Sequence, residues 1–89
     1  MTPTEFLRDQ RRRAVDELRQ RTNGGDLGAS GAIRSRIALI DWLADGADEM
    51  TPGEFQEALA DVINGRRQVP GLLSTQQASD LLQRWLGAR

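Results

Sequence analysis

The stretch MTPGEF at residues 50–55 is nearly the same as MTPTEF at residues 1–6, where the chain begins. In both copies Thr can act as the N-cap of a helix, and Pro suits the first helical position because it has no amide hydrogen. Glu follows three residues after Thr, the spacing of a capping box. The repeated stretch therefore predicts two helix starts, at Thr2 and at Thr51.

Apolar residues follow both starts at helical spacing. After Thr51 they continue to Asn64-Gly65, where Gly can take the left-handed conformation that ends a helix, so a helix is predicted over 52–64. After Thr2 they continue to the polar, Gly-rich stretch 22–25, which predicts a helix over 3–22. The Gly-rich residues 24–31 are interpreted as a connection.

A second pair of similar stretches lies later in each half of the chain. Residues 39–43 and 82–86 share the pattern Leu-x-x-Trp-Leu, and each comes shortly before a Gly. They belong to helices predicted over 30–45 and 75–86. The fold class is therefore all-α, a single small four-helix domain over residues 1–89. Two matches in the same order suggest two similar helical hairpins, although capping boxes and Trp-Leu pairs also recur by chance.

The helical periodicity also predicts a core. Its members are the apolar residues that share one face of each predicted helix: Leu7, Leu18, Ile37, Ile40, Leu43, Phe55, Leu59, Val62, Leu82 and Trp85. If the two halves are related, superposing the first hairpin on the second should place Phe6 over Phe55 and Trp42 over Trp85.

The composition argues against catalysis and tight metal binding. The 89 residues include no Cys, His, Lys or Tyr, so a general base would have to be a carboxylate with a strongly raised pKa. No catalytic residue, cofactor or metal site is predicted, and the chain is not expected to be an enzyme. It has neither a membrane span nor a signal peptide in its pattern, so a cytoplasmic location is expected.

A run of acidic residues lies between residues 41 and 54, but its spacing does not fit a calcium loop. A loop that started at Asp41 would need oxygen ligands at its third and twelfth positions, which are Leu43 and Pro52. Solvated acidic side chains are the simpler interpretation.

Charge divides the chain into three parts. Residues 1–36 have a net charge of +3, residues 37–63 have −7, and residues 64–89 have +3. Acidic residues four positions away can pair with several Arg of the first helix, but Arg8, Arg11 and Arg19 have none at that spacing. We expect the remaining positive charge to complement the acidic part, either within the domain or across a dimer.

Two functions of different classes fit these features. The first is a protein-interaction or regulatory module that binds a protein partner or a second copy through Trp42, Asp41, Asp45 and Phe55. The alternative is a nucleic-acid-binding regulator that uses six arginines: Arg8, Arg11, Arg12, Arg19, Arg34 and Arg36. The net charge of −1 and an isoelectric point near 5.3 favour the first, because dedicated nucleic-acid domains are usually basic.

Trp42 is the main indication of a binding face. It lies about 180° from Ile33 around a helix with 100° per residue, so it sits at the edge of the apolar stripe. A large aromatic side chain there is either covered by a loop of the same chain or left to contact a partner.

Overall fold

The structure is a computed structural model that describes residues 1–25, 27–69 and 74–88. Within these ranges the chain forms four α-helices and one short 3₁₀ helix, and no strand. The elements are α1 (Pro3–Asn23), α2 (Leu27–Ala44), η1 (Ala47–Glu49), α3 (Pro52–Ile63) and α4 (Ser74–Ala88). The prediction of an all-α fold with four helices is confirmed.

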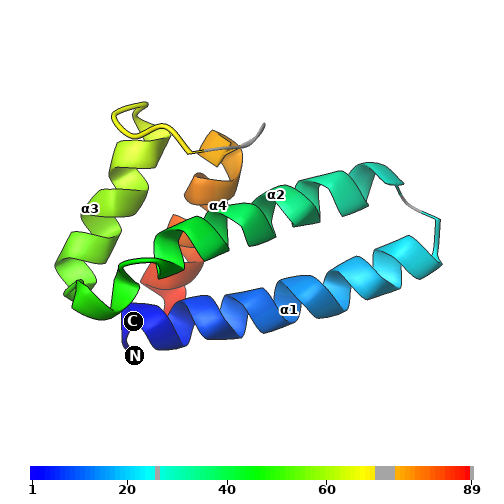
Figure 1. Cartoon of the computed structure of the whole chain (residues 1–89), viewed down its shortest axis with the longest axis horizontal. Helices are drawn as coiled ribbons and strands as arrows, with labels where there is room; N and C mark the ends of the chain where they lie inside the picture. Colours follow the sequence, from blue (N-terminus) through cyan, green and yellow to red (C-terminus); the bar gives the residue numbers. More distant parts are fainter. Residues whose placement is uncertain (26, 70–73, 89) are drawn as a thin grey trace.

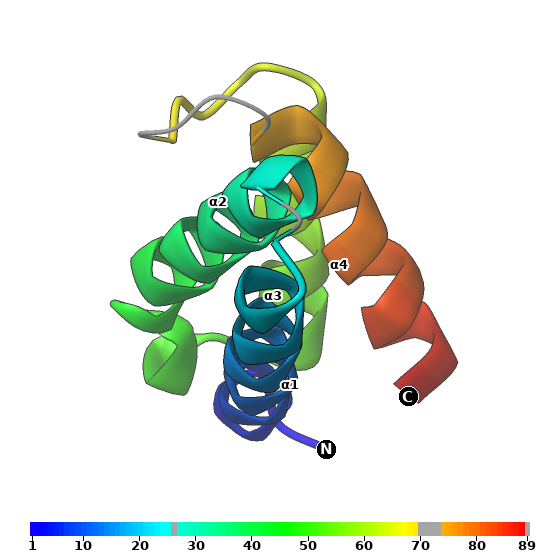
Figure 2. The ribbon, with the colours of Figure 1, turned by 90° about the vertical axis from the view of Figure 1, so that its right-hand side faces the viewer.

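The helices form two hairpins that meet at one end. α1 packs against α2, α3 packs against α4, and α2 also contacts α4. The second hairpin sits at the end of the first that holds the start of α1 and the end of α2, and the α1–α2 turn projects away from it (Figure 1). Viewed along the first hairpin, α4 lies to one side of α1, with α3 behind (Figure 2). The molecule is accordingly elongated, with extents of 38 × 26 × 22 Å.

Local hydrogen bonds start α1 and α3 at the two predicted caps, and Gly65 follows the end of α3 as predicted. Thr51 forms the complete capping box: Glu54 N donates to Thr51 Oγ1 at 3.2 Å, and Thr51 N donates to Glu54 Oε1 at 3.1 Å. At Thr2 only the bond from Glu5 N to the Thr2 hydroxyl forms, also at 3.2 Å. Gly65 follows α3 with a φ of 75°, the left-handed conformation expected of it.

Helix α2 begins three residues earlier than the sequence predicts, within the Gly-rich stretch. Gly disfavours a helix, but this first turn lies against the end of α1, where the Thr22 and Ser30 hydroxyls are 3.4 Å apart. Ser30 is buried there. Packing therefore outweighs the local preference. The short helix η1 also lies in a predicted loop, and α4 continues through Gly87 to Ala88.

Three aromatic rings form the centre of the core. Phe6 of α1, Phe55 of α3 and Trp85 of α4 meet edge to face, with ring centroids 5.0 to 5.9 Å apart. All three are at most 1% exposed. The Trp85 indole N–H is buried and has no hydrogen-bond acceptor among the described residues. An edge-to-face aromatic pair contributes about 0.5–1.5 kcal/mol beyond the burial of its surface. Because the three rings come from both hairpins, these contacts hold the hairpins together.

Seven of the ten predicted core residues are buried. Leu18, Ile37 and Leu82 are instead half-buried. Leu18 lies in the outer part of α1, beyond the last buried residue of that helix, Ala14. Phe6 is more central than predicted, because α4 packs on its side of α1.

A buried polar bridge also joins the hairpins. Arg36 of α2, whose side chain is 10% exposed, donates from Nε to Gln77 Oε1 of α4 at 3.1 Å. Its Nη1 donates to Glu17 Oε2 of α1 at 3.3 Å. Gln77 is 3% exposed, so this bridge satisfies a polar group that water does not reach.

We expect Trp85→Ala to lower the free energy of unfolding by about 3–5 kcal/mol, because it leaves a large cavity between Phe6 and Phe55. The neighbouring Leu86, which is 49% exposed, is the control, and Leu86→Ala should change stability by about 1 kcal/mol or less. Urea unfolding followed by far-UV circular dichroism measures both. Equal transition midpoints would contradict the central position of Trp85.

Arg36→Ala should lower the free energy of unfolding by about 2–4 kcal/mol, because Gln77 loses a buried charged donor. Arg34→Ala removes the same charge from an exposed position on the same helix and should change stability by about 0.5 kcal/mol or less. The same urea experiment compares the pair, and a similar small effect in both variants would show that the bridge is dispensable.

Candidate interaction surface around the end of helix α2

Three hollows among the described residues surround the end of α2 and η1. The arginine hollow, about 250 Å³, has Leu7 and Ile40 among its lining residues and carries Arg8 and Arg11. The η1 hollow, about 440 Å³, lies between the start of α1 and η1. The Trp42 hollow, about 230 Å³, is lined by Trp42 and by residues from the turn after α2 and the α3–α4 connection.

The three hollows are connected through shared lining residues. Thr4 and Ala47 line both the arginine hollow and the η1 hollow. Met50 lines both the η1 hollow and the Trp42 hollow. They therefore form one continuous surface, here called the η1 surface, that runs from α1 past η1 to Trp42.

Trp42 lies at the edge of the core, as its helical position predicts. It is half-buried and packs against the core cluster, together with Met50 and Val69. Arg67, from the α3–α4 connection, lines the same hollow. Trp42 is thus partly covered by its own chain and partly available, so neither of the two sequence-based alternatives describes it fully.

Asp41 is held by α1. Arg11 donates from Nε to Asp41 Oδ1 at 2.8 Å and from Nη2 to Asp41 Oδ2 at 3.5 Å, a bidentate arrangement across the hairpin. The hydrogen bond to Asp41 is the main cause that raises the pKa of Arg11. Both side chains are about half exposed, at 51% and 52%. The acidic middle part of the chain thus supplies a partner for an Arg that has none along its own helix.

The other two predicted partner-binding residues differ from each other. Asp45 is exposed and lines the Trp42 hollow. Phe55 has 0% exposure and belongs to the aromatic cluster, so it has no surface with which to contact a partner. The assignment of Phe55 as an anchor was wrong, because helix periodicity distinguishes an apolar face but not whether another helix covers it.

The six arginines of the nucleic-acid alternative do not form one free set. Arg36 is 8% exposed and bound to Gln77 and Glu17, so it cannot reach a phosphate backbone, and its assignment was wrong. Arg11 is paired with Asp41, and Arg12 with Asp9 at 2.7 Å. The remaining three are exposed: Arg8, Arg19 and Arg34.

Sequence reasoning missed Met50 and Arg67 on this surface. Met50 directly precedes the Thr51 cap. Methionine side chains are flexible and common at binding surfaces, so the residue type alone could have indicated Met50. Arg67 lies 25 positions from Trp42, and no local pattern connects the two.

Metal binding and membrane insertion find no support among the described residues. Nowhere among them do three acidic side chains gather so that they could hold a metal ion. Nor does any described helix combine the length and apolar character needed to cross a membrane. Comparison of the chain with family models, curated proteins and solved structures gave no match.

Proposed function

We propose that this chain is a small helical interaction module that binds a protein partner, or a second copy of itself, through the η1 surface. The observation that carries the proposal is the half-buried Trp42 at one end of a continuous hollowed surface. Trp is enriched among the residues that dominate binding energy, especially where surrounding groups exclude water. We further propose that the module acts in the cytoplasm.

The chemistry of the η1 surface suits a protein partner. Apolar side chains with accessible surface line its hollows, including Met1, Ala44 and the adaptable Met50. Charged residues of both signs lie among them, including Arg8 and Asp48. An apolar centre with a polar rim is the usual composition of a protein interface. A partner would insert individual side chains, since each hollow is small.

Nucleic-acid binding has less support. A phosphate backbone favours uniformly positive surfaces, whereas the η1 surface mixes Arg8 with Asp45 and Asp48. With Arg36 buried and Arg11 neutralised by Asp41, fewer cations remain than the sequence suggests. It stays the alternative against which the proposal is tested.

Trp42→Ala should weaken binding of the partner by about 2 kcal/mol or more, roughly a 30-fold increase in Kd. Because Trp42 packs against the core, we also expect a lower melting temperature. Leu82→Ala is the matched control. Leu82 is also half-buried against the core but lies on α4, and it lines none of the three hollows.

Affinity capture from the native cell, followed by mass spectrometry, identifies the partner. Calorimetry then measures the Kd of the partner for the parent protein and for both variants, at a temperature well below their melting temperatures. Sedimentation of the parent protein detects self-association. Loss of binding in both variants would show that stability, not the Trp42 contact, is responsible. Binding of bulk DNA at physiological salt, lost on Arg8→Gln but not on Trp42→Ala, would instead favour the nucleic-acid alternative.

A further inference from the structure

A fourth hollow, about 340 Å³, lies between α1 and α4, and we call it the α1/α4 hollow. Phe6, Asp9, Gln10 and Arg13 of α1 line it. The α1 residues of the arginine hollow are at positions 4, 7, 8 and 11, which lie on the opposite flank of the helix at 100° per residue. The α1/α4 hollow therefore lies on the other flank of α1 from the arginine hollow, and it meets the η1 hollow only at Met1.

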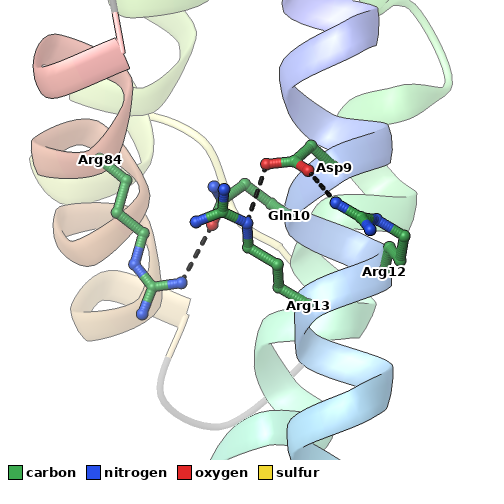
Figure 3. Close-up of polar contacts among 5 residues, drawn as sticks. All are labelled: Asp9, Gln10, Arg12, Arg13 and Arg84. Atoms are coloured by element: carbon green, nitrogen blue, oxygen red, sulfur yellow. Dashed lines mark hydrogen bonds and ion pairs between the residues drawn. The ribbon is translucent and has the colours of Figure 1, made fainter.

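Two guanidinium groups enter this hollow from different helices. Arg13 extends from α1 and Arg84 from α4, both into the space between the two helices (Figure 3). Arg84 Nη1 donates to Gln10 Oε1 at 3.0 Å. Gln10 is 5% exposed, so it forms a fixed polar contact that holds Arg84 over the hollow.

Within the described part of the chain, no carboxylate neutralises the positive charge of Arg84. Its partner Gln10 is neutral, and no described acidic side chain forms an ion pair with it. Asp80 lies four residues earlier on α4, and none of the ion pairs among the described residues joins it to Arg84. Since Arg84 uses only Nη1 for Gln10, its Nε and Nη2 remain able to donate.

Asp9 is the acidic residue of the hollow, and two arginines share it. Arg12 Nη2 lies 2.7 Å from Asp9 Oδ1, and Arg13 Nε lies 3.0 Å from Asp9 Oδ2 (Figure 3). The hydrogen bond from Arg12 is the main cause that lowers the pKa of Asp9, so this carboxylate carries one negative charge at neutral pH. Both terminal nitrogens of Arg13 remain able to donate.

We propose that the α1/α4 hollow binds a phosphate group between Arg13 and Arg84. Asp9, Arg13 and Arg84 are the charged residues that line the hollow, and Arg12, outside it, also pairs with Asp9. An anion between the two guanidinium groups therefore meets a net positive charge. Guanidinium groups donate two parallel hydrogen bonds to phosphate oxygens, and here two such groups approach from different helices. The site does not depend on the function proposed for the η1 surface.

The test titrates inorganic phosphate into the whole chain at constant ionic strength, with sodium chloride as the balance. NMR signals of the Arg Nε–H groups report binding at each side chain. We expect a saturable shift of the Arg13 and Arg84 signals. Arg84→Gln should weaken binding about tenfold, the loss expected for one hydrogen bond to a charged group. Arg13→Gln should weaken it similarly. In each variant the binding is followed through the signal of the remaining arginine.

Arg34→Gln is the control. It removes the same charge from an exposed position on α2 that does not line the hollow, and it should leave the Kd unchanged. Equal losses in Arg34→Gln and Arg84→Gln, or shifts that do not saturate, would overturn the site as a general ionic effect. Acetate is the second arm: equal affinity for acetate would overturn the assignment to phosphate. Circular dichroism checks that each variant is folded. If Arg84→Gln unfolds, the phosphate affinity of Arg13→Gln tests the site instead, because the Arg13 side chain is 66% exposed.

Discussion

The edge-to-face contacts of Phe6, Phe55 and Trp85 are the interaction on which the rest of the structure depends. They bring together rings from α1, α3 and α4, and so they join the two hairpins. The Trp85 N–H is buried without an acceptor among the described residues, which costs about 1–3 kcal/mol. Burial of the indole and its two ring contacts offsets this loss. The ring packing therefore contributes more to stability than a hydrogen bond from the Trp85 N–H would.

Because the second hairpin docks at one end of the first, α1 has two different flanks. One flank faces α2 and η1 and carries Arg8 and Arg11, beside the surface proposed for a protein partner. The other faces α4 and carries Arg13, beside the hollow proposed for phosphate. One amphipathic helix thus contributes to two proposed sites of different chemistry, since the residues opposite it differ: Asp41 on one side and Arg84 on the other.

The arginines show how neighbours from other helices decide what a side chain does. Arg36 is buried in a bridge to Gln77 and Glu17, where it stabilises the contact between hairpins. Arg11 pairs with an acid 30 positions away, and Arg84 is held by a neutral amide. A guanidinium group has five donors, so its role follows from which acceptors lie within reach. That information is not contained in its position along a helix.

The sequence by itself determined the four helices, their caps at Thr2 and Thr51 and the stop at Gly65, because these depend on hydrogen bonds and periodicity among residues close in the chain. It also placed Trp42 at the edge of an apolar face. The relation between the two halves stays a prediction. Only the tertiary structure decided burial: Trp42 and Trp85 occupy the same motif, yet one is half-buried and the other is central. The reason is physical, because burial depends on which distant helix covers a face. Phe6 of α1 and Phe55 of α3 pack against the ring of Trp85, whereas neither packs against the ring of Trp42.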